Sequence, residues 1–322
     1  MSFGGVQRLR TFTLVLDLGS ISAAASVLGY TQSAVSQQLA ALERELGVPL
    51  VDRSQRPLRA THAGELARPH VDRVLAAVGA ARTALADIHE GMRRVRLAAF
   101  TSALSSFVPS AVRDLRRADQ DIVVQVLQLE TREATERVRA GQADLAVVHH
   151  MPGVAVPDTA GLERRALLVD ELWVVVPEGH SLARRDAISV ADLEAEPLIM
   201  PRRETPAGRF RSVVEQLCAK AGFEPRVAYE LDDLPAAQAF AAAGIGVVPM
   251  HGLTLATVRP GCVAVPLAER GAGSRAVEAI VPAGTRTGAA ADLFQHLAQA
   301  ARQWSARSTV SRSSGPGGAL RA

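Results

Sequence analysis

The segment from Ser20 to Arg59 places the tightest constraint on the fold, because it contains a helix whose two ends are both marked in the sequence. Thr31 is a good N-cap residue and Gly47 is a good residue to end a helix, so roughly four turns are predicted between them. The residues that recur at helical spacing on one stripe are apolar: Val35, Leu39, Leu42 and Leu46. That stripe is expected to face a core.

The opposite face of this helix is short, polar and mostly uncharged. It consists of Ser33, Ser36, Gln37, Ala40 and Arg44. Small hydroxyl and amide groups are what a helix needs in a DNA major groove, where they exchange hydrogen bonds with base edges. A solvated helix of this length would more often carry Glu and Lys pairs, although a surface helix with an ordinary polar side stays an alternative interpretation.

A shorter helix precedes this one. Ser20 to Leu28 has the pattern of a helix that begins with a cap at Ser20 or Ser22, and Gly29 and Tyr30 form a tight connection after it. Two helices joined this closely, the second of them capped and polar on its outer face, predict a helix-turn-helix. Val6 to Leu18 is expected to be a first helix, with Val6, Leu9, Phe12 and Leu16 facing inward.

These residues resemble the LysR-type transcriptional regulator family. The matching positions are Phe12, Gly19, Ser20, Ala24, Ala25, Leu28, Gln32, Ser33, Ala34, Val35, Ser36, Leu39, Leu42, Glu43, Leu46, Gly47, Leu50, Arg53, Arg56, Thr61, Ala63 and Gly64. The sequence departs from the family pattern at one place, where Val51 and Asp52 separate Leu50 from Arg53 and the family usually has an aromatic residue. The resemblance implies a regulator that binds a double-stranded DNA operator.

The predicted DNA-contacting residues lie in this helix and in the segment after it. They are Thr31, Gln32, Ser33, Ser36, Gln37, Arg53 and Arg56. Val48 to Ala60 contains Pro49, Pro57 and alternating apolar residues, which predicts a short two-stranded wing. The wing arginines are expected to hold phosphates, while the glutamines and serines of the helix read bases.

A long helix is predicted from about His62 to His89, capped by Thr61. Its apolar seam, at spacings of three and four, is formed by Leu66, Val71, Val74, Leu75, Val78, Ala81, Leu85 and Ile88. A second copy of the helix could cover this seam, which favours a homodimer or homotetramer, and the resemblance implies a dimerising linker helix here. Packing against the chain's own second domain is the alternative. Pro69 is expected to kink or break the helix.

Residues 90–94 form a charged boundary, after which the spacing of the apolar residues changes. From there on, predicted strands alternate with predicted helices. This alternation predicts parallel β-α-β units in two α/β lobes. The expected fold is therefore an α plus α/β chain, and the resemblance implies an effector domain of the periplasmic-binding-protein type. The expected domains are the winged helix-turn-helix at 1–60, the linker helix at 61–90, the effector domain at 91–305 with lobe I at 93–167 and 268–305 and lobe II at 168–267, and a disordered tail at 306–322.

Helices and strands of ordinary length are expected in these lobes. Ser102 to Arg117 is expected to be one helix, Leu168 to Val176 one strand closed by Pro177, and Ala289 to Trp304 the last helix.

A small-molecule site is predicted beyond the carboxyl ends of the strands, which is where ligands bind in open α/β sheets. This rule selects Thr101, Ser102, His149, Arg202, Arg203, Thr205, Gly246 and Val247. The Thr101 and Ser102 hydroxyls, with free backbone N–H groups, suit a carboxylate, and Arg202 or Arg203 could pair with it, so the hypothesis is an anionic effector. The alternative is that Ser102 only caps a helix and that the arginines are solvated.

Several other classes of function are disfavoured. The adjacent His149 and His150 point in opposite directions on a strand, so no metal or cofactor is expected, and Cys218 and Cys262 lie too far apart in sequence for a redox motif. No catalytic motif is present, although an enzyme with a fused helix-turn-helix, or a solute-binding protein, is an alternative. Neither an export signal nor a long apolar run is found, so we expect a cytoplasmic protein with no membrane partner.

Overall fold

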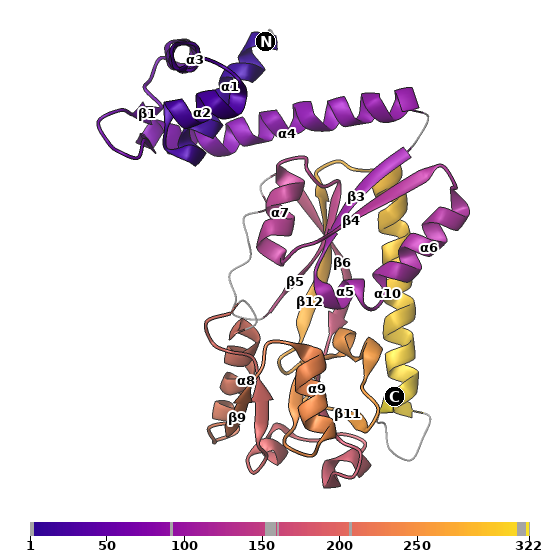
Figure 1. The fold of residues 1–322 in the computed structure, drawn as a ribbon. Helices are drawn as coiled ribbons and strands as arrows, with labels where there is room; N and C mark the ends of the chain where they lie inside the picture. The colour runs from indigo at the N-terminus through magenta and orange to yellow at the C-terminus, as the bar shows by residue number, and fades with distance from the viewer. Residues whose placement is uncertain are drawn as a thin grey trace. The chain divides into compact units, whose positions relative to one another are not determined.

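The computed structural model describes residues 3–90, 93–151, 159, 161–205, 208–313 and 320–321 (Figure 1). The chain divides into two compact units, one formed mainly by residues before 93 and one formed by most of the residues from 93 onward.

The N-terminal unit begins with three helices, α1 (Phe3–Leu18), α2 (Ile21–Leu28) and α3 (Gln32–Leu46). The caps predicted for α3 are confirmed: the Thr31 hydroxyl accepts from the Ala34 N–H at 3.2 Å, and Gly47 is left-handed with φ 75°. Ser20, not Ser22, is the N-cap of α2. The three helices share one core, which contains Leu9, Phe12, Val15, Ala24, Ala25, Val35, Leu39 and Leu42.

The predicted wing is present as two short antiparallel strands, β1 (Val51–Asp52) and β2 (Arg59–Ala60). Val51 is buried in the core of this unit, at the place where the family usually has an aromatic side chain. The carboxylate of Glu43, which lies on α3, accepts hydrogen bonds from the backbone N–H groups of Leu50 and Val51 at 2.8 and 3.2 Å. The base of the wing is therefore held directly by the third helix.

A kink or a break was predicted at Pro69, and the break is wrong, because helix α4 (His62–Glu90) continues through this residue. Pro69 is exposed, and a proline removes only one backbone hydrogen bond from a helix that has many others. Arg68 binds Asp72 within α4 at 3.0 Å and Asp17 of α1 at 2.9 Å. At Gly64 a Cβ atom would lie 2.1 Å from the Leu50 carbonyl oxygen, so only glycine allows this close packing.

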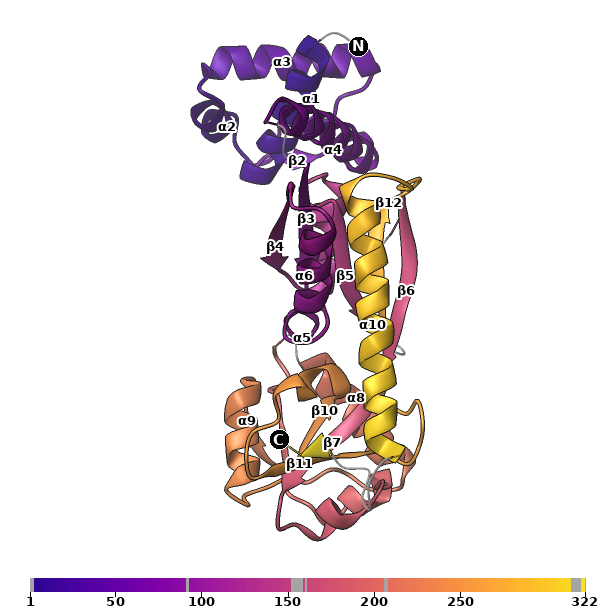
Figure 2. The ribbon, with the colours of Figure 1, turned by 90° about the vertical axis from the view of Figure 1, so that its right-hand side faces the viewer.

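The second unit contains a five-stranded sheet, which we name the first lobe. Its strand order is β4 (Ile122–Gln128), β3 (Arg93–Ala99), β5 (Leu145–His150), β12 (Arg275–Pro282) and β6 (Leu162–Asp170). As predicted, β3 is parallel to β4 and β5, whereas β12 is antiparallel to β5 and β6. Helices α6 (Val108–Ala118) and α10 (Ala289–Ser313) lie side by side on one face (Figure 2). Helix α7 (Thr131–Arg139) connects β4 to β5.

The second lobe is built on a sheet ordered β10 (Val248–His251), β7 (Leu172–Pro177), β11 (Cys262–Pro266) and β13 (Leu320–Arg321). A parallel pair, β8 (Leu198–Met200) and β9 (Val227–Glu230), lies with it. Helices α8 (Gly208–Lys220) and α9 (Leu234–Ala242) pack on these strands. Short 3₁₀ helices complete the lobe: η1 (Ser181–Arg184), η2 (Val190–Leu193) and η3 (Gly252–Thr257).

Three predicted elements differ from the structure. The single strand Leu168 to Val176 is wrong, because the chain leaves the first lobe at Asp170 and enters the second at Leu172. The helix Ser102 to Arg117 is interrupted, giving α5 (Thr101–Leu104) before α6, since Pro109 favours the start of a helix over its interior. The last helix continues to Ser313, into the segment 306–322 predicted as a tail, where no proline or glycine stops it before residue 314; residues 314–319 and 322 lie outside the described part.

A buried ion pair lies where the chain passes between the lobes. Asp170 ends β6 and Arg275 begins β12, and their side chains approach to 2.8 Å while only 3% and 8% exposed. The other Asp170 oxygen accepts from the Leu253 N–H of η3 at 2.9 Å, and Arg275 donates to the Ser102 hydroxyl of α5 at 2.7 Å. Burial raises the pKa of Asp170, and the facing guanidinium opposes this shift. The pair therefore joins β6 and β12 of the first lobe to η3, which follows β10 of the second lobe and whose Leu253 is buried in the core of the first.

Replacement of Arg275 tests this arrangement. Arg275→Met leaves a buried carboxylate without its cation, a change that typically costs about 3–5 kcal/mol. Urea unfolding of the full chain, followed by tryptophan fluorescence, is expected to show this loss. The exposed Arg286, which lies 3.3 Å from Glu163, provides the matched control. If Arg275→Met is no more destabilising than Arg286→Met, the buried pair does not hold the lobes as described.

Candidate DNA-binding surface and effector site

The predicted base-reading residues lie on the solvent side of α3. Thr31, Gln32, Ser33 and Gln37 are exposed and Ser36 is half-buried. The Thr31 hydroxyl caps the helix and also lies 2.9 Å from the Ser33 hydroxyl, so part of its hydrogen-bonding capacity is already used. The exposed amides of Gln32 and Gln37 are therefore better placed to meet a partner outside the chain.

Two residues near this surface were not selected from the sequence. Glu43 holds the base of the wing, as described above, and only its match to the family pattern signalled it. Gln38 is half-buried, and its side-chain oxygen accepts from the fully buried Thr11 hydroxyl at 2.6 Å. This bond fixes Gln38 against α1, so Gln38 supports α3, whereas the exposed Gln37 beside it faces solvent.

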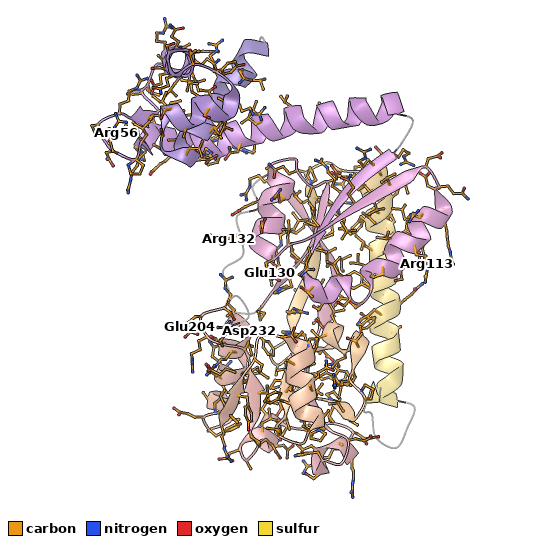
Figure 3. The ribbon with its side chains drawn as sticks, in the orientation of Figure 1. Arg56, Arg113, Glu130, Arg132, Glu204 and Asp232 are labelled. Carbon is orange, nitrogen blue, oxygen red and sulfur yellow. The ribbon has the colours of Figure 1, made fainter. Side chains whose placement is uncertain are left out.

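The two wing arginines differ in their surroundings. Arg53 lies 3.0 Å from the Glu43 carboxylate, and its side chain is 48% exposed. Arg56 is exposed at the turn of the wing and has no ion-pair partner among the described residues (Figure 3). The charge of Arg53 is thus partly compensated within the unit, and that of Arg56 is open to an external anion.

The predicted effector residues of the first lobe lie at the carboxyl ends of β3 and β5. Thr101 is exposed and accepts a hydrogen bond from the Gln128 amide at 3.1 Å. Ser102 is buried and accepts from Arg275, so its hydroxyl is already engaged in the pair between the lobes. His149 packs edge-on against the ring of Phe100 with 4.8 Å between the ring centroids.

His149 also faces a carboxylate. Its Nε2 atom lies 3.8 Å from Glu130, which follows β4, while its Nδ1 atom is buried without a hydrogen-bond partner among the described residues. Burial lowers the pKa of His149, so the ring is neutral near pH 7. The facing imidazole N–H holds the pKa of Glu130 below its usual value, so this carboxylate is charged.

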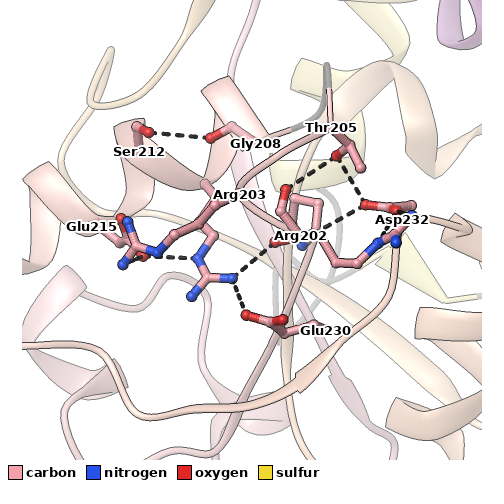
Figure 4. Close-up of polar contacts among 10 residues, drawn as sticks. Arg202, Arg203, Thr205, Gly208, Ser212, Glu215, Glu230 and Asp232 are labelled. Carbon is pink, nitrogen blue, oxygen red and sulfur yellow. Dashed lines mark hydrogen bonds and ion pairs between the residues drawn. The ribbon is translucent and has the colours of Figure 1, made fainter.

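The predicted effector residues of the second lobe belong to a network of ion pairs (Figure 4). Arg202 binds Asp232 at 2.6 Å, and Arg203 binds Glu215 at 2.7 Å. The Thr205 hydroxyl donates to the same Asp232 at 3.0 Å. Each predicted cation of this lobe therefore already has a carboxylate partner.

Gly246 and Val247 lie behind this network as packing residues. A Cβ atom at Gly246 would lie 2.5 Å from the Pro197 carbonyl oxygen, and Val247 is buried. The Val247 N–H donates to the same carbonyl at 2.9 Å. These two residues position β8 beside β10 and expose little of their own chemistry.

The remaining features are possible metal ligands, the two cysteines and the hydrophobicity of the helices. Within the described ranges no cluster of three or more His, Cys, Asp or Glu side chains has the arrangement of a metal site. Cys218 and Cys262 are both buried, and burial raises the pKa of the Cys218 thiol to about 11, which keeps it protonated. Among the described helices, none is both long and apolar enough to cross a membrane.

Comparison with known proteins agrees with the two units. Residues 6–65 match the model of the bacterial regulatory helix-turn-helix protein, lysR family, and residues 89–302 match the LysR substrate binding domain. The HTH-type transcriptional regulator ShiR of Corynebacterium glutamicum (strain R) is 32% identical over 265 residues, which cover 81% of this chain and 88% of ShiR.

Solved structures share the fold. Full-length CbnR, solved in complex with its target DNA, aligns with a TM-score of 0.58 and 22% identity over 93% of this chain and 99% of CbnR. The effector binding domain of BenM, solved with its effector benzoate, aligns with a TM-score of 0.56 and 20% identity over 67% of this chain and 93% of that domain. Because the family models match both units and most of the chain, the protein belongs to the LysR family of transcriptional regulators.

Proposed function

We propose that this regulator reads its operator with the exposed face of α3 and holds the DNA backbone with the wing. The observation that carries this proposal is the geometry of α3. Val35, Leu39 and Leu42 of its apolar stripe are buried, whereas Leu46, which was also expected to face the core, is exposed at the C-terminal end of the helix. The capped N-terminal turns expose uncharged polar side chains. Such a face offers hydrogen bonds to base edges without the desolvation cost of burying a charge. CbnR, which shares the fold, has been solved on its target DNA.

We further propose that a small effector binds at the carboxyl ends of the strands in the two lobes. Its contacts would come from Thr101, Ser102 and His149 of the first lobe and from the Arg202 to Thr205 loop of the second. BenM, with the same effector-domain fold, has been solved with benzoate. The prediction that this chain's effector is anionic stays a prediction, and the ion pairs of Arg202 and Arg203 do not favour it.

Effector binding would act on DNA binding by changing how the lobes close. The Asp170–Arg275 pair lies where the chain passes between the lobes, and Arg275 donates a hydrogen bond to Ser102. A ligand that binds the Ser102 hydroxyl in place of Arg275 would therefore change the surroundings of this ion pair. This is a coupling between two distinct sites, as allosteric control requires. In a homodimer or homotetramer joined through α4, such a change would alter the spacing or bend of the DNA.

Two further properties of the protein are its lack of enzymatic activity and its location in the cell. We propose a regulator without enzymatic activity, since both units match domains of transcriptional regulators. Because it has to reach DNA, we place it in the cytoplasm.

Replacing Gln37 tests base reading. A duplex bound by the full chain is first selected from a random pool, and binding of single-base variants of this duplex is then measured. Gln37→Ala is expected to relax preference at one or two base pairs by about 1–3 kcal/mol, with little change in the dependence on salt. The matched control is Gln142→Ala, a glutamine of the α7 to β5 connection. If Gln37→Ala keeps the base preference of the unaltered protein, Gln37 does not contact the bases and the assignment of α3 as the base-reading helix is contradicted.

Replacing the wing arginines tests backbone contact. Arg56→Ala is expected to weaken binding to all duplexes and to reduce the slope of log affinity against log salt by about one, because one phosphate contact is lost. Arg53→Ala is expected to have the same direction with a smaller effect, since Glu43 already compensates part of its charge. Equal slopes for Arg56→Ala and the unaltered protein would contradict wing contact.

A further inference from the structure

The charges at the facing ends of the two lobes are not those of an anion site. Arg202, Arg203 and Arg275 are each paired with a carboxylate, at 2.6 to 2.8 Å. An incoming carboxylate would have to displace one of these partners, and removing a partner from a close ion pair is costly. The two arginines that were predicted to bind the effector, and Arg275, are therefore already paired.

Two carboxylates at the same ends have no guanidinium partner within ion-pair distance among the described residues, although the charge of Arg275 helps to lower the pKa of Glu130. Figure 3 shows Glu130 at the end of the first lobe nearest the second, and Glu204 at the end of the second lobe nearest the first. Glu130 is 62% exposed on its side chain, so it can be reached from outside, and its only ion-pair neighbour in the described ranges is the ring of His149 at 3.8 Å. Glu204 is exposed and has no ion-pair partner among the described residues.

His149 adds a second acceptor to this surface. The Nε2 atom of His149 faces Glu130 at 3.8 Å, and the neutral ring carries a single N–H. In the tautomer that places this N–H on Nε2, toward the carboxylate, the Nδ1 atom has a free lone pair. That atom is buried, and no donor reaches it in the part of the chain that the structure describes. A buried acceptor without a donor is unfavourable, and a bound molecule with a suitable hydrogen bond would relieve it.

We propose that, in the effector site proposed above, Glu130 binds the protonated amino group of a small organic amine, with the His149 Nδ1 atom as a second acceptor for a donor of the same molecule. This inference rests on the proposed effector site and specifies its chemistry. Thr101 and Gln128, which are hydrogen-bonded to each other at 3.1 Å, border the same strand ends and offer further polar contacts to such a molecule.

The test measures binding of matched amines and carboxylates to the full chain by titration calorimetry. The probes are benzylamine and benzoate, hexylamine and hexanoate, and cyclohexylmethylamine and cyclohexanecarboxylate. At least one amine is expected to bind more tightly than its carboxylate counterpart. Glu130→Gln keeps the shape of the side chain and removes its charge. This substitution is expected to lower the affinity for that amine by roughly tenfold, because a hydrogen bond to a charged group is lost. The matched control is Glu178→Gln, an exposed glutamate just after β7.

The outcomes separate this inference from the proposed function. Tighter binding of the carboxylates, binding of no amine in the panel, or equal amine affinities in Glu130→Gln and the unaltered protein would each overturn the amine site. Binding of the selected duplex is measured on the same samples. If the protein binds the duplex but no amine, the amine site alone is rejected. If the unaltered protein shows no sequence preference among duplexes, the proposal that it is a sequence-specific regulator is rejected.

Discussion

The interaction on which the N-terminal unit depends is the burial of one stripe of α3 between two well-defined caps. Val35, Leu39 and Leu42 are buried against α1 and α2, which fixes the rotation of the helix about its axis. The Thr31 cap fixes where the helix starts. Together these constraints determine which side chains of α3 face solvent, so the core alone defines its exposed polar face.

The same helix also positions the wing. Glu43 lies on α3 and binds two backbone N–H groups at the start of β1 as well as Arg53. A shift of α3 would therefore move the wing with it. Gly64 allows the linker helix to approach the Leu50 carbonyl, so α4 is packed against the same short segment. Helix α3, the wing and helix α4 consequently all contact the short segment at Leu50 and Val51.

The sequence predicted those features that depend on neighbours in the chain. The caps of α3, the extent of α4 and the parallel strands β3, β4 and β5 were all signalled locally. The division between β6 and β7 was not, because only Asp170 and Glu171 separate two apolar stretches whose strands join different sheets. The ion pairs of the arginines were also not predictable. Asp232 lies 30 residues from Arg202 in the sequence, and Asp170 lies 105 residues from Arg275, so only the fold brings these partners together.

The central claim is that the exposed face of α3 and the turn of the wing meet DNA. Hydrogen–deuterium exchange of the full chain, with and without a duplex selected from a random pool, tests it most directly. The account predicts slower exchange of backbone amides in residues 31–37 and 53–56 with the selected duplex, and unchanged exchange near residues 178–180. Protection confined to other surfaces, with residues 31–37 exchanging as in the free protein, would contradict it.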